Sequence, residues 1–226
     1  MGDKVVKDSI RIKNEYPMNL YIENLEINIK SFDLHCQNIA FNAGDVFLIV
    51  APNGSGKSMF LKGIVDLAKT SRRKIKIDNE YINKFNLSEV IAAYLGEEFL
   101  IPFYEPIEYF QLIGKIKGLE SSEIKLIIES ISDVFNQKWP KKFIRELSTG
   151  MKKRVGLAGS LMGSPQIILW DEPFENVDEE SQHLLREFIK NEKRLIIYSS
   201  PSSTNLPSTD ILTIESGKVL MKSHIS

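Results

Sequence analysis

The sequence has little cysteine and no long apolar run, and each scarcity excludes a class of protein. Its one cysteine, Cys36, cannot form an intramolecular disulfide, which fits a reducing cytosol rather than a secreted, disulfide-rich fold. The longest apolar runs, at 46–52 and 167–170, fall far below the roughly 18 residues that a membrane-spanning helix needs. Residues 1–11 lack the apolar stretch of a signal peptide. We therefore expect a cytoplasmic chain that does not cross a membrane by itself.

The charged side chains show no excess of one sign. With 29 basic and 30 acidic residues the formal net charge is −1 at pH 7, so bulk attraction to nucleic acid or to anionic lipid is not expected. At 42% hydrophobic and 26% charged, the composition is that of a folded protein rather than a disordered one. The length predicts one large domain over residues 1–226, without internal repeats and without a nucleic-acid partner.

The pattern of apolar residues predicts an α/β fold. The runs at 46–50, 167–170 and 195–198 are unbroken, as in strands that are covered on both faces of a parallel sheet. Helical spacing follows at 58–69, after a glycine-rich turn, and again at 179–191. Strands that alternate with helices indicate a mainly parallel sheet.

Two kinds of segment depart from this alternation. Residues 74–77 and 211–214 alternate polar and apolar side chains and run into turn residues, which predicts antiparallel hairpins in a flanking β layer. From 106 to 143 apolar residues recur at helical spacing, so we expect a helical subdomain, spanning approximately 98–155, inserted in the core. The Ser, Thr and Pro cluster at 199–209 is typical of a loop.

A phosphate-binding loop is predicted where the first buried strand meets its helix. Residues 51–58 read Ala-Pro-Asn-Gly-Ser-Gly-Lys-Ser. Glycines let backbone N–H groups face a phosphate, the helix N-terminus adds partial positive charge, Lys57 adds a full charge, and Ser58 can ligate Mg²⁺. Ala51 stands where the strict pattern has glycine; the alanine has less backbone freedom than glycine, but it adds only one methyl group. The nucleotide-binding candidates are Pro52, Asn53, Gly54, Ser55, Gly56, Lys57, Ser58 and Met59.

An acid pair follows the second buried strand. Asp171 and Glu172 end the run at 167–170, at the strand edge where α/β sheets hold their ligands. Two acids after a strand would, on their own, mark a solvated loop. Beside a phosphate loop, Asp171 can hold the magnesium shell and Glu172 can polarise a water for in-line attack on the γ-phosphate. Glu172 and Lys57 are the predicted catalytic residues.

With a third motif the chain resembles a known family. A phosphate loop, then Leu-Ser-Thr-Gly at 147–150, then Leu-Trp-Asp-Glu-Pro at 169–173, looks like the ATP-binding subunit of an ATP-binding-cassette (ABC) transporter, a P-loop NTPase. The resemblance implies that two cassettes, identical or different, enclose two ATP molecules, with each phosphate loop facing the other cassette's signature segment. It also implies a separate transmembrane subunit. The signature residues here are Ser148, Thr149, Gly150 and Met151.

Further positions follow from the same resemblance. Asp178 matches an acid that meets its counterpart across the dimer, and Glu97 matches a glutamine that senses Mg²⁺ and the attacking water. An aromatic residue ahead of the phosphate loop stacks on adenine in the family, and Phe32 is the candidate, although such an aromatic is commonly a core residue. The predicted metal ligands are therefore Ser58, Asp171 and Glu97.

The chain departs from the family pattern at several of these positions. Thr149 and Met151 replace a glycine and a glutamine of the signature, and a β-branched residue is unfavourable if position 149 requires positive φ. Ser200 stands where the family has a histidine that binds the γ-phosphate. Losing one such donor costs about 10²–10³ in rate, so we expect slow or asymmetric hydrolysis.

The family resemblance leads to one main hypothesis and two alternatives. The main one is an ATPase subunit that drives transport through a separate membrane subunit on the inner face of the membrane. The stretch at 94–98, Tyr-Leu-Gly-Glu-Glu, is similar to one in export systems and suggests export. The alternatives are a soluble, non-transport ABC ATPase and a degenerate nucleotide-binding module.

Overall fold

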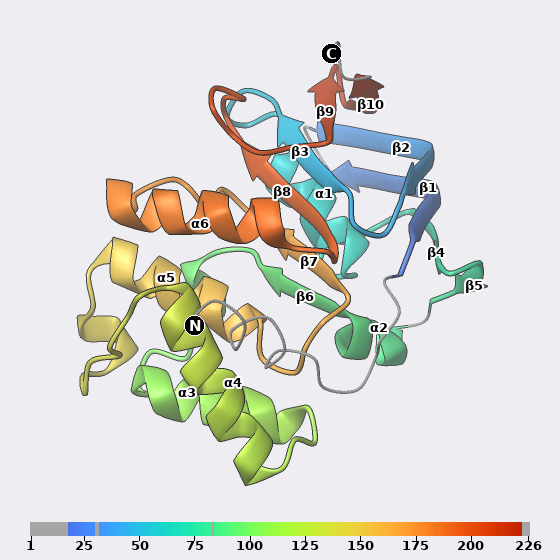
Figure 1. Ribbon diagram of the computed structural model, residues 1–226. Helices are drawn as coiled ribbons and strands as arrows, with labels where there is room; N and C mark the ends of the chain where they lie inside the picture. The colour runs from blue at the N-terminus through green and yellow to red at the C-terminus, as the bar shows by residue number, and fades with distance from the viewer. Residues whose placement is uncertain (1–17, 30–31, 83, 223–226) are drawn as a thin grey trace.

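The computed structural model describes residues 18–29, 32–82 and 84–222, so the segment examined for a signal peptide, 1–11, lies outside the described residues. The described chain forms one ten-stranded sheet in the order β5-β4-β1-β2-β10-β9-β3-β8-β7-β6 (Figure 1). The strands are β1 (Leu20–Ile29), β2 (Phe32–Phe41), β3 (Val46–Val50), β4 (Arg72–Ile77), β5 (Glu80–Tyr81), β6 (Ile91–Tyr94), β7 (Ile167–Trp170), β8 (Leu195–Ser200), β9 (Asp210–Glu215) and β10 (Lys218–Lys222). The helices are α1 (Lys57–Ile64), α2 (Lys84–Val90), α3 (Pro106–Ile116), α4 (Ser121–Val134), α5 (Thr149–Ser160) and α6 (Glu179–Asn191), with 3₁₀ turns η1 (Glu97–Phe99) and η2 (Ile144–Glu146).

The sheet combines a parallel core with antiparallel strands, as the sequence predicts, and β10 joins the two by pairing in parallel with β2 and antiparallel with β9. Strand β3 pairs in parallel with β8 and β9, and β7 pairs in parallel with β8 and β6. The pairs β1–β2, β1–β4, β4–β5 and β9–β10 are antiparallel, and they include both expected hairpins. The predicted fold class, an α/β cassette with a parallel core, an antiparallel layer and a helical part, is therefore confirmed.

Both faces of the parallel strands are buried, which explains their unbroken apolar runs. Side chains alternate along β7, so that Ile167 and Leu169 join one apolar cluster while Ile168 and Trp170 join the other. The first cluster lies between the antiparallel strands and α1, and the second lies under α3, α4, α5 and α6. In Figure 1, α3 and α4 lie at the end of the molecule away from β9 and β10. The ends of β3, β7 and β8 lie between these two layers.

Helix α1 is shorter than the expected 58–69 and ends at Ile64. Asp66 adopts a left-handed φ of 58°, and the N–H of Leu67 turns back to the carbonyl of Lys62 at 2.8 Å. Arg73 of β4 then donates to the carbonyls of Gly63 and Ile64 at 3.2 and 2.7 Å. A side chain from a distant strand thus satisfies the terminal carbonyls, and periodicity within the helix carries no signal of it.

Two other expected boundaries were wrong. The helical pattern expected over 106–143 ends at Val134, because Asn136 takes a left-handed φ of 44° and Trp139 packs edge-on against Phe110, 4.9 Å between ring centroids. The loop expected at 199–209 begins two residues later, since Ser199 and Ser200 extend β8 and pair with Ile49 and Val50 of β3.

Candidate functional site

The phosphate loop is a turn between β3 and α1 that depends on two glycines. Gly54 and Gly56 have φ of 79° and 104°, a region that residues with a side chain rarely adopt. The N–H of Ser55 closes the turn on the carbonyl of Pro52 at 3.2 Å. Ala51, where the strict pattern has glycine, is not among the positive-φ residues, so its methyl group causes no backbone strain.

Lys57 is the buried cation of the loop. It is 4% exposed, and its Nζ donates to the carbonyls of Ala51 and Pro52 at 2.9 and 3.4 Å and to Asn53 Oδ1 at 3.4 Å. The same Nζ lies 3.3 Å from Glu172 Oε1. The loop and the acid that follows β7 are therefore in direct contact, although 115 residues of sequence separate them (172 − 57).

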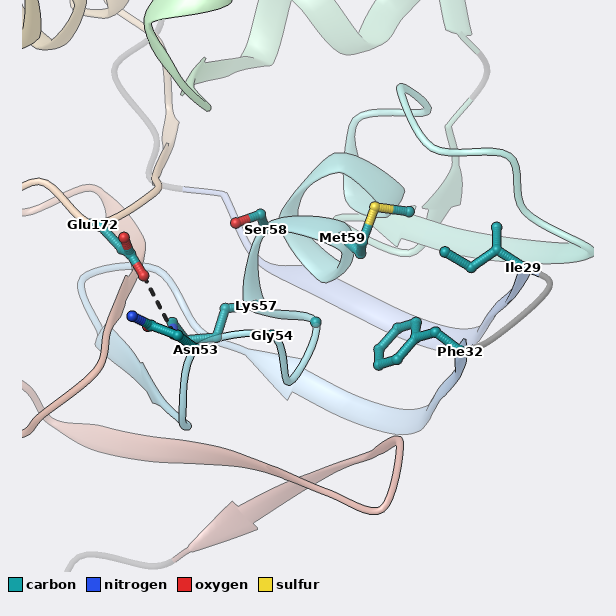
Figure 2. Close-up of a pocket in the computed structure, with 9 residues that line it drawn as sticks. Ile29, Phe32, Asn53, Gly54, Lys57, Ser58, Met59 and Glu172 are labelled. Carbon is teal, nitrogen blue, oxygen red and sulfur yellow. Dashed lines mark hydrogen bonds and ion pairs between the residues drawn. The ribbon is translucent and has the colours of Figure 1, made fainter.

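A cavity of about 460 Å³ opens over this loop. Figure 2 shows Glu172 at one side of the loop and Phe32 at the other. A Cβ built on Gly56 would lie 2.1 Å from Phe32 Cζ, so the aromatic ring rests on the loop backbone. Sequence reasoning missed Ile29, which pairs with Phe32 across β1 and β2. The cavity is lined by Ile29, Phe32, Asn53, Gly54, Gly56, Lys57, Ser58, Met59 and Glu172.

The acid pair is held by side chains that sequence reasoning also missed. Ser199 Oγ donates to Asp171 Oδ1 at 2.5 Å and accepts from the N–H of Glu172 at 2.9 Å. Lys153 Nζ donates to the carbonyl of Glu172 at 2.7 Å. Ser199 could have been noticed, because it is a polar residue at the end of an apolar strand beside the phosphate loop. Lys153 follows the signature segment, but no spacing rule assigns it to Glu172.

Burial and neighbouring charges shift the pKa values of two groups here. Desolvation lowers the pKa of Lys153, an effect opposed by the charges of Glu175, Glu172, Glu97 and Asp171. A side-chain hydrogen bond with Glu172, together with burial, raises the pKa of Glu175. The charge of Lys153 therefore offsets part of the repulsion among these acids.

The signature segment forms the start of α5. Ser148 is the N-cap, and its Oγ accepts from the N–H of Met151 at 3.3 Å. Thr149 is the first helical residue and is not among the positive-φ residues, so the condition under which its β-branched side chain would strain the backbone is not met. Gly150 is a close-contact position instead, since a Cβ there would lie 2.8 Å from the carbonyl oxygen of Asn176.

Three other predicted positions do not line the described cavity. Asp178 caps α6 by accepting from the N–H of Ser181 at 2.8 Å, and its Oδ2 lies 3.3 Å from Arg154 Nη2 of α5. Glu97 lies 3.9 Å from Lys152 Nζ, also on α5. Ser200 is buried at the end of β8, where its Oγ accepts from the N–H of Ser202 at 3.3 Å. Neither the signature residues nor Asp171 line this cavity among the residues described.

The loop fits a phosphate group, and its surroundings fit a hard cation. Within the described part of the chain, Ser55 Oγ is buried without a hydrogen-bond partner, which leaves a donor for an anion. The Ser58 hydroxyl, which lines the cavity, is an oxygen donor of the kind that Mg²⁺ prefers, and so are the two carboxylates predicted from the sequence, Asp171 and Glu97, although neither lines the cavity. The described residues contain no group of three or more His, Cys, Asp or Glu that could hold a metal by itself.

Comparisons with known proteins identify the family. A family model described as "ABC transporter" matches residues 34–175. The ABC transporter ATP-binding protein NatA of Bacillus subtilis is 29% identical over 194 residues, which cover 82% of this chain and 79% of that protein.

Solved structures agree on the fold. The structure of an ATP-binding subunit of an ABC transporter superposes with a TM-score of 0.77 at 20% identity and covers 90% of this chain and 89% of that one. The structure of a dimeric bacterial ABC transporter cassette superposes with a TM-score of 0.75 at 20% identity, and the match covers 91% of this chain and 98% of that one. No helix in the described ranges has the length and apolar character needed to span a bilayer. The chain therefore belongs to the ABC transporter family, as an ATP-binding subunit.

Proposed function

We propose that this chain binds ATP with Mg²⁺ at the phosphate loop and hydrolyses it to drive transport. The observation that carries the proposal is the 3.3 Å contact between Lys57 Nζ and Glu172 Oε1, two residues that line the cavity. In this proposal Lys57 is the cation for the β- and γ-phosphates, and the neighbouring Glu172 is the carboxylate that polarises water. Phosphoryl transfer depends mainly on such positioning and on electrostatic stabilisation.

The residues of the site have distinct roles in this proposal. The N–H groups around Gly54 and Gly56 bind phosphate oxygens, and Lys57 exchanges its contacts with the loop carbonyls for the β- and γ-phosphates. Glu172 accepts a hydrogen bond from the attacking water. Ser58, Asp171 and Glu97 are the residues that would hold Mg²⁺, and the ion would neutralise charge on the phosphates. Phe32, beside Gly56, provides an aromatic surface for the base.

A second cassette, the same or different, completes the site. The signature residues Ser148, Thr149, Gly150 and Met151 lie at the N-terminus of α5 rather than in the cavity of their own chain. We propose that they meet the nucleotide bound to the partner cassette, and that Asp178 contacts the opposing chain. The dimeric form of a similar cassette supports this arrangement.

A separate transmembrane subunit would dock on the segment near 102–109 and hold the chain on the inner face of the membrane. The N–H of Ile144 in η2 donates to the carbonyl of Tyr104 at 2.9 Å, so η2 lies beside the start of this segment. Phe103 and Phe143 are 63% and 40% exposed there, and the Arg145 guanidinium lies 4.8 and 5.6 Å from their ring centroids. Exposed aromatic rings around an arginine are typical of protein interfaces. The resemblance at 94–98 favours export as the direction of transport.

Hydrolysis is proposed to be slow. A serine hydroxyl at position 200, already accepting from the N–H of Ser202, does not supply a charged donor to the γ-phosphate. This position also supports a second candidate function, a nucleotide-binding module that pairs with a more active cassette and does not itself turn over ATP.

Turnover measurements separate the two candidates. We expect purified wild-type protein to hydrolyse ATP slowly and the Glu172→Gln variant to bind ATP but to retain only a small residual turnover. Brisk hydrolysis by wild type alone would contradict the impaired site. Binding without turnover, both alone and with a co-purified membrane subunit, would favour the nucleotide-binding module. Co-purification from native membranes identifies that subunit and, through it, the direction of transport.

A further inference from the structure

The backbone of Glu172 is bonded on both sides by side chains from other elements. Its N–H donates to Ser199 Oγ of β8 at 2.9 Å, and its C=O accepts from Lys153 Nζ of α5 at 2.7 Å. Glu172 itself has a left-handed φ of 48°, which is unfavourable for a residue with a side chain. Such a conformation persists only where surrounding contacts hold it.

The hydroxyl of Ser199 links the two acids. Ser199 is fully buried, and its single hydroxyl hydrogen is directed to Asp171 Oδ1 at 2.5 Å while the oxygen accepts from Glu172. A hydroxyl can donate one hydrogen bond and also accept, so the Ser199 hydroxyl bonds the Asp171 carboxylate as a donor and the backbone N–H of Glu172 as an acceptor. The position of the Glu172 peptide is therefore tied to the carboxylate of Asp171.

Lys153 provides the second bond from the signature helix. Its side chain is 7% exposed, and an ammonium group buried to that extent needs hydrogen bonds to oxygen. Its bond to the Glu172 carbonyl spans from α5 to the segment after β7. A movement of α5 would therefore act directly on the peptide that carries Glu172.

We propose that Ser199 and Lys153 are positioning residues that hold the Glu172 peptide so that its carboxylate faces the phosphate loop. The proposal rests on the proposed function, in which Glu172 polarises the attacking water. The carboxylate already lies 3.3 Å from Lys57 Nζ in this arrangement. Without either bond the left-handed conformation loses a support, and the carboxylate samples positions away from the γ-phosphate.

The first test compares deletion with conservative replacement. We expect Ser199→Ala and Lys153→Met each to lower kcat about tenfold with KM for ATP within about twofold of wild type, because the lost bond acts on the chemical step rather than on nucleotide binding. Ser199→Thr, which keeps the hydroxyl, should retain most of kcat. A Ser199→Ala variant with unchanged kcat, or a threonine variant as impaired as the alanine variant, would overturn the role of Ser199. An unchanged kcat in Lys153→Met would overturn that of Lys153.

Matched controls come from the helical part of the molecule. Ser132 Oγ accepts from Trp139 Nε1 at 2.9 Å, and Lys117 Nζ donates to the carbonyl of Ser88 at 2.8 Å. Ser132→Ala and Lys117→Met therefore remove comparable bonds away from the phosphate loop. We expect them to leave kcat unchanged, and unfolding temperatures of all variants check that the proteins are folded. Equal losses of kcat in the controls would show a general effect of lost bonds and would overturn the proposal.

The Glu172→Gln background tests whether both residues act through Glu172. In that background we expect Ser199→Ala and Lys153→Met to cause no further loss of residual turnover, since the carboxylate they position is gone. An additional tenfold loss there would overturn the proposal. This non-additivity distinguishes positioning from general destabilisation, which would add in either background.

A readout without turnover separates this proposal from the proposed function. If wild type binds ATP but shows no hydrolysis, the catalytic part of the proposed function fails. Amide hydrogen exchange at Glu172 still tests whether the Ser199 hydroxyl holds the Glu172 peptide in place. We then expect faster exchange in Ser199→Ala, which lacks the acceptor, and wild-type exchange in Ser199→Thr. Unchanged exchange in the alanine variant would overturn the proposal.

Discussion

The N-termini of α1 and α5 differ in how their backbone donors are satisfied. Helix α1 begins after Gly56, which has a φ of 104° and offers no side chain to cap the first N–H groups. Helix α5 begins after Ser148, whose Oγ accepts from the N–H of Met151. The first four N–H groups of any helix lack a partner within the helix, so the uncapped terminus is the better anion site.

This difference agrees with the proposal that the phosphate loop forms a site within one chain, whereas the signature residues need a second chain. At α1 the uncapped amides, Lys57 and the Glu172 carboxylate converge on one cavity. At α5 one donor is already used within the chain, and the signature residues lie outside that cavity. The phosphate loop should therefore bind nucleotide in an isolated chain, whereas α5 should matter only when a second cassette is present. The predictions below test this division.

The largest expected effect is on nucleotide binding by Lys57→Ala. The variant removes the cation of the loop and leaves the Glu172 carboxylate without its partner. A hydrogen bond to a charged group contributes about 1.5–3 kcal/mol, so ATP should bind about 10- to 100-fold more weakly. Titration calorimetry on the isolated chain measures the change. Lys69→Ala is the control, because Lys69 is exposed beyond the end of α1. Intact affinity in Lys57→Ala would disprove the assignment of the phosphate loop.

A pair of glycine variants tests the left-handed backbone conformation of the loop that leaves α1 uncapped and the contact of this loop with Phe32. Gly54→Ala adds a methyl group that meets no atom within 4 Å, so only the backbone strain of about 1–2 kcal/mol is expected. Gly56→Ala adds the same kind of strain and a Cβ placed 2.1 Å from Phe32 Cζ, which should cost about 1–3 kcal/mol more. Urea unfolding measures both changes in the free energy of unfolding.

The contact with Phe32 can be isolated by a second substitution. Phe32→Ala in the Gly56→Ala background removes the ring that the new methyl group meets, so it should recover the overpacking part of the loss but not the backbone strain. If the double variant is as unstable as the sum of the two single variants, the ring does not rest on the loop as described.

Local sequence patterns predicted the fold class and the turn between β3 and α1 well, because both depend on residues close together in the chain. Unbroken apolar runs indicated β3, β7 and β8, and 179–191 matched α6. The end of α1 was missed because Arg73, from β4, caps its carbonyls. The bonds from Ser199 and Lys153 to Glu172 were missed for the same reason, since each joins segments that meet only after folding.

A smaller effect is expected from Ser148→Ala, which tests the capped helix. Loss of the N-cap bond to Met151 should lower the free energy of unfolding by about 1 kcal/mol. Ser148→Thr keeps an N-cap oxygen and should restore most of that stability. ATP binding by the isolated chain should not change in either variant. A loss of ATP affinity in the isolated chain would show that α5 contributes to the site in its own chain and would remove the proposed difference between the two helices.

The smallest effect is expected from Asp178→Asn, which changes the charge near α5 but keeps a capping oxygen. Hydrogen bonds from Ser181, with the charge of Arg154, lower the pKa of Asp178 from its ordinary value of 3.8. The ionised carboxylate therefore contributes stability that is present above pH 3.8 and is lost as the pH falls through the lower folded value. Because the side chain is 53% exposed, Asp178→Asn should cost only about 0.5 kcal/mol at neutral pH. Urea midpoints should converge with wild type below the folded pKa, while Asp178→Ala, which also loses the cap, should remain less stable at both pH values. If the urea midpoints of Asp178→Asn and wild type still differ below the folded pKa, the charge of Asp178 does not help to hold α5 against the start of α6.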